Sequence, residues 1–357
     1  MSRKIQKRGF FMKRWPSYRD LKKWLTLAVV LLGLLYGTIF LFPVVPNQSN
    51  TVDGSSYRVK INPNSGLISI SDQLRAQGLV VNSVALHLGA RSLLVASKLK
   101  PGTYILPNGA SLGKVLLQIA RGDRVTESIA IIPGMTIWQL RALMDSQSAM
   151  IHRTKGMNNK ELLQQLNLKY SSDEGLFLPD TYVFDPDELD LNIYRRAAQA
   201  MQKQLMQIWE QREPGLPLKT PYELLILASI IEKETGRLSD RNLVSAVFIN
   251  RLNKGMPLQT DPTVIYGIGP KFDGNLKKAD LRRDTPYNTY MHKGLPPTPI
   301  AMPSKESILA AAHPAKSNAL FFVAKGDGSS HFSQNLKEHE AAVDRYQRKI
   351  MPKNNSN

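Results

Sequence analysis

The feature that most constrains this chain is an uninterrupted apolar run near its N-terminus. Residues 24–45 read WLTLAVVLLGLLYGTIFLFPVV, and no charge occurs between Lys23 and Asp53. At about 1.5 Å per residue, a helix of this length spans about 33 Å, which exceeds the hydrocarbon core of a bilayer. A buried helix of a soluble protein carries a polar stripe, whereas this run offers only Thr26 and Thr38. The sequence therefore predicts a transmembrane helix over 24–45.

An uncleaved anchor fits this run better than a signal peptide does. The apolar region of a signal peptide is about 7–15 residues long and precedes a small-x-small site, but here VVPNQSN follows. Residues 1–23 hold nine Lys or Arg and one acid, and the positive-inside rule keeps such a tail in the cytoplasm. We therefore expect a single-pass protein of the bacterial cytoplasmic (inner) membrane. Its cytoplasmic basic tail is 1–23, and the remainder is periplasmic or extracytoplasmic.

Composition excludes several classes of function. The 357 residues carry 47 Lys+Arg against 29 Asp+Glu, a net charge of +18, and no cysteine. Disulfides, thiolate zinc sites and iron–sulfur clusters are thereby removed. The six histidines are scattered and form no HExxH pair, so we expect no metal and no cofactor. Nearly half of the surplus charge lies in the tail, and no RRM or zinc-finger fingerprint follows, so we expect no nucleic-acid partner.

Patterning divides the exported part into a linker and two folded regions of the α+β class. Residues 46–56 are polar and predict a linker. Residues 57–124 predict a small α+β module, because YRVKI alternates as a strand and LGKVLLQIA has helical spacing. Ser71 is a candidate helix cap there. Residues 125–346 predict a larger mixed α/β domain and 347–357 a disordered tail. Further predictions are a helix over 191–209, two helices over 222–252, and a binding surface in the Pro- and Gly-rich stretch 256–304.

The sharpest chemical feature is the segment 222–236, YELLILASIIEKETG. Its apolar helix ends in Glu232 and Glu234, and Gly236 is a natural terminating residue. Burial and the negative end of the helix dipole both disfavour an ionised carboxyl there. Either glutamate could therefore carry a raised pKa, which suits a general acid that works at neutral pH.

The two glutamates occupy different faces of that helix. Glu232 lies over Ala228 and Ser229, whose small side chains leave room for a substrate, whereas Glu234 lies over Ile230 and a face typical of a core. We therefore predict that Glu232 is the working acid. The alternative for both is an ordinary solvated helix end.

Polar residues elsewhere supply candidate substrate contacts. Gln259, Asp261, Asn288 and Tyr290 lie in two turn-rich segments. Rings that stack on sugar faces and amides that pair with hydroxyl and acetamido groups are typical of a carbohydrate cleft. Glu174, in EGLFLPD, is a further candidate. Asp261 and Glu174 can equally be turn or cap residues.

Four segments together resemble the YceG-like family, which includes endolytic murein transglycosylases. They are ASIIEKETG, SAVFINRLNKGMPLQTDPTVIYG, YNTYMHKGLPPTPIAMP and LAAAHPAKSNALFFVAKGDGSSHFSQNLKEH. The resemblance covers about residues 57–346. It implies a LysM-like module over 57–124, a YceG-like catalytic domain over 125–346 with its catalytic glutamate on a helix, and lytic cleavage of nascent peptidoglycan. It also implies that the first acid of EKET, Glu232, is the catalytic glutamate.

The expected mechanism needs one carboxyl. Glu232 protonates the oxygen between N-acetylmuramic acid and N-acetylglucosamine, and then accepts the proton of the muramoyl C6 hydroxyl as this attacks C1. The product is a 1,6-anhydro end, which limits strand elongation. Two alternatives stay open: a two-carboxylate hydrolase that uses Asp261, and a non-catalytic peptidoglycan-binding scaffold of division or elongation. The expected partners are glycan strands, the membrane and nearby membrane-bound peptidoglycan synthases.

Overall fold

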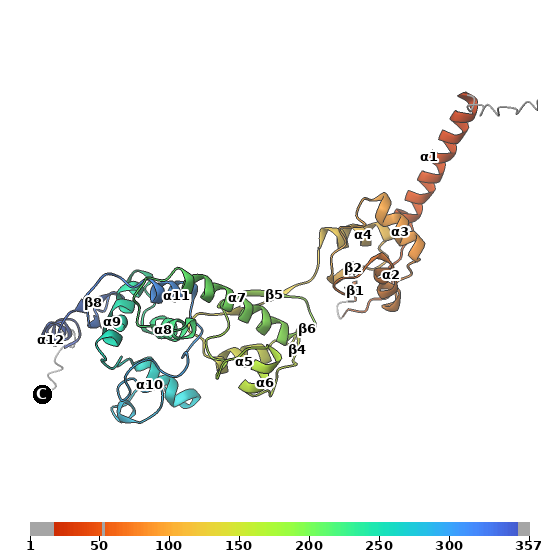
Figure 1. Cartoon of the computed structure of the whole chain (residues 1–357). Helices are drawn as coiled ribbons and strands as arrows, with labels where there is room; N and C mark the ends of the chain where they lie inside the picture. Colours follow the sequence, from red (N-terminus) through yellow and green to blue (C-terminus); the bar gives the residue numbers. More distant parts are fainter. Residues whose placement is uncertain (1–17, 52–53, 349–357) are drawn as a thin grey trace, which may run out of the picture. The chain divides into compact units, whose positions relative to one another are not determined.

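The protein is a mixed α+β chain with one apolar helix near its N-terminus (Figure 1). The computed structural model describes residues 18–51 and 54–348. The chain divides into two compact units, Met1–Thr126 and Glu127–Asn357. Every sheet of the described residues has two strands, so helix packing builds most of both cores. Most of the predicted basic tail and of the predicted C-terminal tail lies outside the described residues.

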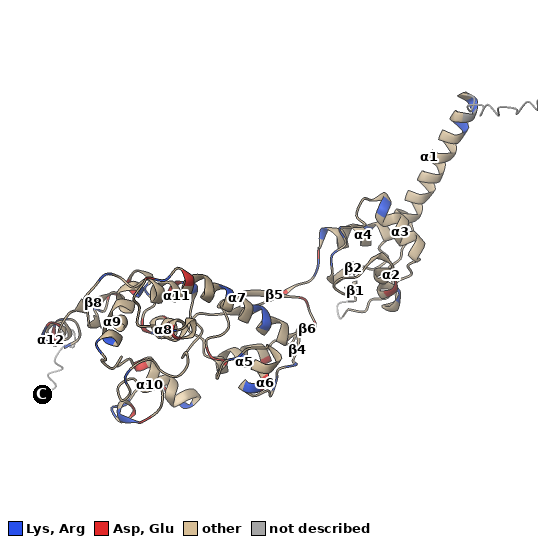
Figure 2. Ribbon diagram, viewed as in Figure 1, with Lys and Arg blue, Asp and Glu red and all other residues tan. Residues whose placement is uncertain are grey.

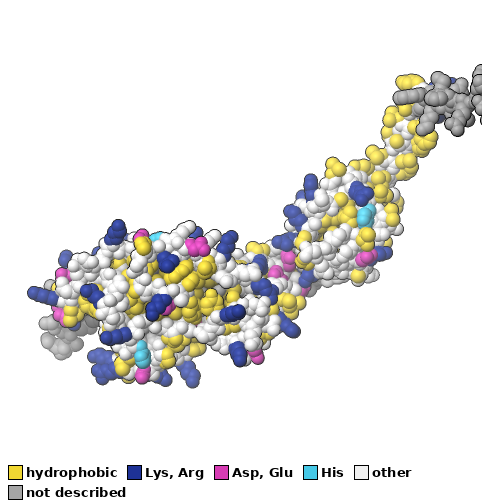
Figure 3. All heavy atoms as spheres, in the orientation of Figure 1, with side chains coloured by type: hydrophobic (Ala, Val, Ile, Leu, Met, Phe, Trp, Pro, Cys, Tyr) yellow, Lys and Arg dark blue, Asp and Glu magenta, His cyan; other side chains and the backbone are white. Residues whose placement is uncertain are grey.

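Helix α1 (Tyr18–Leu41) contains the apolar run. Its part Leu21–Leu41 is long and apolar enough to cross a membrane and is hardly buried. Basic residues colour only its N-terminal end in Figure 2, and apolar side chains cover the rest in Figure 3. The helix ends earlier than predicted because Pro43 lacks a backbone N–H and disfavours helical geometry just before it. This helix fits a single-pass membrane anchor.

The chain after α1 contacts the first unit, both just before the predicted linker 46–56 and within it. Pro43 forms a β-bridge with Ser111, and Val45 is 3% exposed within the core of the module. The side-chain Nδ2 of Asn50 donates to the carbonyl of Arg58 at 2.9 Å. Module structure therefore begins at the end of α1.

The module pairs two strands and packs three helices against them. Strands β1 (Ser56–Ile61) and β2 (Gly102–Pro107) are antiparallel. The predictions of a strand over 57–61 and a helix over 112–120 are confirmed by β1 and α4. Ser71 is fully buried inside a helix, so its predicted capping role is wrong. The helices are α2 (Leu67–Ala76), α3 (Ser83–Ser92) and α4 (Leu112–Arg121).

The second unit alternates short strands and helices before its main helical layer. Strands β3 and β5 pair antiparallel, β4 and β6 pair parallel, and β7 and β8 pair antiparallel. The strands are β3 (Glu127–Ile131), β4 (Met150–Ile151), β5 (Asp180–Phe184), β6 (Glu188–Leu189), β7 (Phe321–Ala324) and β8 (Ser330–Ser333). The helices are α5 (Ile137–Asp145), α6 (Asn159–Gln165), α7 (Asp190–Glu210), α8 (Pro221–Glu234), α9 (Arg241–Asn253), α10 (Asp261–Ile268), α11 (Lys305–Ala312) and α12 (Leu336–Val343). Single turns add η1 (Leu238–Asp240), η2 (Gly269–Lys271), η3 (Asp280–Arg282) and η4 (Asp344–Arg348).

Helix α8 is the centre of this unit. Residues 224–231 are all buried, because α7, α9, α10 and α11 each pack against the helix. Thr220 caps its start by accepting from the N–H of Glu223, and Pro221 follows at the first turn. The helix ends at Glu234, and the extended backbone of Thr235, rather than a left-handed Gly236, terminates it. The prediction of two helices over 222–252 is confirmed.

Candidate active site

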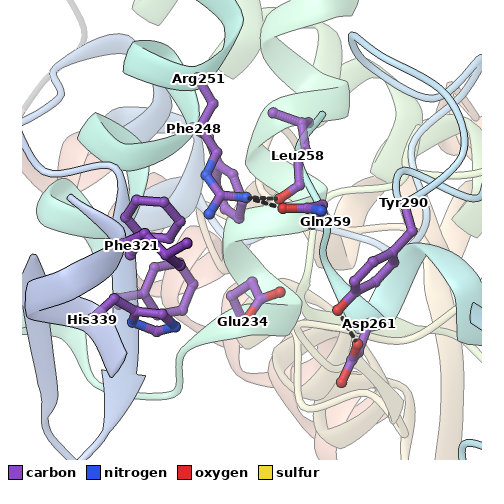
Figure 4. A pocket seen from close by; sticks show the side chains of 11 residues that line it. Glu234, Phe248, Arg251, Leu258, Gln259, Asp261, Tyr290, Phe321 and His339 are labelled. Carbon is purple, nitrogen blue, oxygen red and sulfur yellow. Dashed lines mark hydrogen bonds between the residues drawn. The ribbon is translucent and has the colours of Figure 1, made fainter. Parts of the chain in front are cut away.

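A cavity of about 400 Å³ lies at the C-terminal end of α8. It combines two carboxyls, an amide, a guanidinium and several rings, and Figure 4 shows most of them as sticks. Such a mixture of apolar wall and convergent polar groups is typical of a small-molecule or sugar site. The lining residues are Glu234, Phe248, Arg251, Leu258, Gln259, Asp261, Tyr290, Phe321, Phe322, Leu336 and His339.

Glu234 lines the cavity from the last turn of α8. Figure 4 shows Phe321 and His339 on one side of it, Tyr290 and Asp261 on the other, and Arg251 and Gln259 above it. Its Oε1 accepts a hydrogen bond from the hydroxyl of Thr260, and within the described residues it forms no ion pair. Burial raises the pKa of Glu234, the neighbouring Asp261 raises it further, and the Thr260 hydrogen bond and Arg251 act in the opposite direction.

Two turn-rich segments meet beside this glutamate through Thr289. The carbonyl of Thr289 accepts from the N–H of Gln259 at 3.1 Å, and its hydroxyl accepts from the N–H of Thr260 at 3.1 Å. Gln259 adopts a left-handed backbone with φ 51°, which turns the chain into α10. Helix α10 then begins at Asp261, with Pro262 in its first turn.

Three of the predicted substrate contacts, Gln259, Asp261 and Tyr290, line the same cavity as Glu234. The hydroxyl of Tyr290 donates to Oδ1 of Asp261 at 2.7 Å. The guanidinium of Arg251 donates to the side-chain oxygen of Gln259 at 3.3 Å and to the carbonyl of Leu258 at 2.9 Å. These bonds fix the polar groups around Glu234 before any substrate is bound.

Asn288 is not among the residues that line the cavity, and its substrate contact stays a prediction. It is fully buried, and its Nδ2 donates to the carbonyl of Arg283 at 2.7 Å and to that of Leu281 at 3.1 Å. Its Oδ1 accepts from the N–H of Tyr290 at 2.9 Å. Asn288 therefore shapes the loop that presents Tyr290.

Glu174 is likewise fully buried and does not line the cavity, and its substrate contact stays a prediction. Its Oε2 accepts from the N–H of Ile137, at the start of α5, at 2.9 Å. Burial raises the pKa of Glu174 to about 8, although the Ile137 N–H opposes this. The buried carboxyl of Glu174 therefore supports the start of α5.

Glu232 occupies a closed polar cluster instead of the expected groove. Its side chain is 6% exposed and pairs with the guanidinium of Arg241, itself 9% exposed, at 3.1 Å. Its other oxygen accepts from the N–H of Ser304 at 2.8 Å and from the Ser304 hydroxyl. Ser304 is the N-cap of α11, so Glu232 joins the end of α8 to the starts of α9 and α11.

The small residues beneath Glu232 explain why the predicted faces are reversed. Ala228 and Ser229 leave room on α8, but α11 packs into that room. The hydroxyl of Ser229 accepts from the N–H of Ile300 at 3.0 Å, which brings the approach to α11 close to α8. Small side chains on a helix permit close backbone approach as readily as they leave space for a ligand. The prediction that Glu232 faces a groove and Glu234 faces the core is therefore wrong.

Sequence reasoning missed Arg251 and His339 as well as the placement of Glu234. Arg251 lies in the last turn of α9, where a basic residue usually interacts with the helix dipole. His339 stacks on Phe321 at 5.1 Å, and burial lowers the pKa of its imidazole, which favours the neutral ring. No sequence pattern marks a histidine of a polar helix as a cavity residue. Across 18–51 and 54–348, no group of three or more His, Asp or Glu could hold a metal ion.

The chain is similar to a family model, to curated proteins and to a solved structure. The model of the YceG-like family matches residues 59–345. The endolytic murein transglycosylase of Bacillus subtilis (strain 168) is 31% identical over 335 residues, covering 88% of this chain and 90% of that protein. The protein of the same name from Streptococcus pneumoniae serotype 2 is 28% identical over 354 residues, with 88% of this chain and 63% of that protein covered. A solved yceG-like protein from Listeria monocytogenes is 27% identical, with a TM-score of 0.49, and the match covers 80% of this chain and 98% of that one.

Proposed function

Because the chain belongs to the YceG-like family, we propose that it is an endolytic murein transglycosylase. It is a lyase that cleaves the bond between N-acetylmuramic acid and N-acetylglucosamine within nascent peptidoglycan strands and leaves a 1,6-anhydro end. The names of the curated relatives support this activity. The observation that carries it is a carboxyl of raised pKa, Glu234, inside a polar and aromatic cavity.

Glu234, rather than Glu232, is the acid of this proposal. Protonated Glu234 gives its proton to the glycosidic oxygen as the bond from that oxygen to C1 of the muramoyl sugar breaks. Positive charge develops at C1. The resulting carboxylate then takes the proton of the C6 hydroxyl while this oxygen bonds to C1. The enzyme returns to its starting protonation state, and no water is consumed.

The neighbours of Glu234 suit the two halves of this cycle. Burial and the Asp261 carboxylate favour the proton-bearing form that starts the reaction. The Thr260 hydrogen bond and the nearby Arg251 stabilise the carboxylate that forms midway. Asp261, held by the Tyr290 hydroxyl, supplies negative charge for the cationic sugar. Gln259 offers an amide for hydroxyl or acetamido groups.

A hydrolase on the same polymer is the second candidate, because Asp261 shares the cavity with Glu234. There Asp261 would activate water or form a glycosyl-enzyme. Mass spectrometry of the products separates the two: the lyase gives anhydro ends, which are lighter than reducing ends by one water. A non-catalytic scaffold predicts instead that neither wild type nor Glu234→Gln releases any cleavage product.

The membrane topology extends this proposal. We place the N-terminus in the cytoplasm and both folded units outside the cytoplasmic membrane, because positive charge precedes α1. The chain has no cysteine, so single cysteines at Ser2 and Ser317 can be labelled in intact cells or spheroplasts. An impermeant maleimide should label Ser317→Cys alone. Labelling of Ser2→Cys alone would reverse the topology.

The module after α1 is proposed to be LysM-like and to hold the strand near the membrane, where synthases release it. Its small α+β fold, directly continuous with α1, supports this role. Ile68 is exposed on α2 beside a shallow hollow. If the hollow binds glycan, Ile68→Glu should weaken retention of the full chain on insoluble peptidoglycan. Unchanged retention would count against sugar binding there.

A further inference from the structure

A second cavity, of about 450 Å³, borders the same end of α8. We call it the aromatic pocket. Its walls come from the start of α5, the end of α8, and α10 with the chain that follows it. The residues are Thr136, Trp138, Gln139, Lys233, Pro262, Ile265, Tyr266, Gly269, Pro270, Phe272 and Ile300.

Consecutive residues separate the aromatic pocket from the cavity of Glu234. Lys233 lines the aromatic pocket and Glu234 the other cavity. Likewise, Pro262 lines the aromatic pocket and Asp261 lines the cavity of Glu234. Neighbouring Cα atoms lie about 3.8 Å apart, so one turn of α8 and one turn of α10 stand between the two spaces. The two cavities therefore adjoin the same end of α8 and the same start of α10.

The wall of the aromatic pocket is preformed. Trp138 stacks on Tyr266 with ring centroids 5.0 Å apart and an angle of 28° between the planes. Tyr266 also meets Tyr287 edge to face at 4.8 Å. These contacts thus hold the ring of Tyr266, which supports Trp138. A rigid wall of this kind lowers the entropic cost of binding.

Two polar groups beside this wall have unused binding capacity. Lys233 is exposed and donates only to the carbonyl of Gly134, at 3.3 Å; it forms no ion pair with any residue that the structure describes. The side-chain oxygen of Gln139 accepts from the N–H of Thr136 at 2.9 Å, which leaves its amide NH₂ able to donate. Lys233 is the one charged residue that lines the pocket.

We propose that the aromatic pocket binds a second, peptide-bearing sugar of the strand, with the sugar face on Trp138, the acetamido oxygen near Gln139 and a peptide carboxylate on Lys233. This inference rests on the proposed function and adds to it the substrate class: strands that keep their peptides, in preference to bare glycan. An apolar ring receives the C–H face of a sugar, and a lysine ammonium pairs with a carboxylate.

Binding is measured with the full chain in detergent, carrying Glu234→Gln so that the probes stay intact. The probes are soluble uncross-linked glycan strands with their peptides, and the same strands after an amidase has removed the peptides. Calorimetry should show tighter binding of the peptide-bearing strands. Trp138→Leu should weaken binding of both probes about fivefold to tenfold, from the usual worth of an aromatic contact. Lys233→Met should weaken only the peptide-bearing probe, by a few-fold.

Matched controls are Trp209→Leu and Lys203→Met, which change the same residue types on α7, outside both cavities. They should leave both affinities unchanged. Thermal melting checks that each variant is folded, and Phe272→Ala, which changes another ring of the pocket, replaces Trp138→Leu if that variant melts early. The proposal is overturned if neither probe binds, if folded Trp138→Leu or Phe272→Ala binds as tightly as its parent, or if Lys233→Met weakens both probes equally. Failure of the proposed function shows differently, as a wild-type chain that releases no 1,6-anhydro ends from the peptide-bearing strands.

Discussion

The two sides of the last turn of α8 offer opposite settings to two glutamates that are two residues apart. On one side, α9 and α11 close over Glu232, and Arg241 and Ser304 occupy both of its oxygens. On the other side, α10 begins beside Glu234 and a cavity remains. The chemistry of a carboxyl is therefore set by the elements that pack against it and much less by its place in the helix.

The comparison also shows how each carboxyl avoids an unpaired buried charge. Glu232 meets this requirement with the guanidinium of Arg241. Among the residues that the structure describes, the hydroxyl of Thr260 is the one direct donor to Glu234, and burial raises the pKa of this carboxyl. An unpaired carboxyl in low dielectric keeps its proton because ionisation there is costly. Glu234, which has fewer partners than Glu232, is thus the carboxyl that can donate a proton.

The largest expected effect is on catalysis at Glu234. Glu234→Gln keeps the shape of the side chain and removes the ionisable proton, so the rate of glycan cleavage should fall by about a hundredfold or more. The measurement is turnover of uncross-linked peptidoglycan strands by the full chain in detergent. Glu210→Gln, an exposed glutamate at the end of α7, is the matched control. A loss of less than about tenfold would show that another residue is the general acid.

The next effect is on stability at Glu232. Glu232→Gln leaves the buried guanidinium of Arg241 without its counter-charge, which should lower the free energy of unfolding by about 3 kcal/mol. Urea denaturation measures this. The double variant Glu232→Gln with Arg241→Met should recover part of the loss, because it leaves no unpaired charge. Folded Glu232→Gln should still cleave strands, and full stability of the single variant would contradict the structural role.

Helices with one apolar stripe, such as α7, could be predicted from the sequence because their periodicity is local. Helix α10 was missed because DPTVIYGI contains Pro and Gly, although Thr260 and Pro262 are ordinary helix-start residues. The pair of glutamates and three of the cavity residues could also be predicted. Which glutamate faces the cavity could not, since it depends on where α10 and α11 pack, and those contacts join residues far apart in the chain.

A smaller effect concerns pH. The acid must be protonated, so activity should fall as pH rises through the pKa of Glu234, at a higher pH than an ordinary glutamate would give. Asp261→Asn removes a negative neighbour that raises this pKa, and the alkaline limb of the pH–rate profile should move to lower pH. The rate at the optimum should drop only several-fold. A loss of a hundredfold with no shift of the limb would favour the two-carboxylate hydrolase.

The smallest effect is expected at Tyr290. Tyr290→Phe removes the 2.7 Å hydrogen bond to Asp261, a contact worth about 1 kcal/mol at a partly exposed site. Cleavage should slow a few-fold, and Gln259→Ala is a companion change in the same cavity. Steady-state kinetics with soluble strands measures both. An effect of Tyr290→Phe as large as that of Glu234→Gln would give the tyrosine a direct chemical role.

The most direct test compares the products of wild type, Glu232→Gln and Glu234→Gln, adjusted to equal concentrations of folded protein, by mass spectrometry of the strand ends. We expect 1,6-anhydromuramoyl ends from wild type and from Glu232→Gln, and none from Glu234→Gln. If Glu234→Gln still released anhydro ends and Glu232→Gln did not, the general acid would be Glu232 and not Glu234.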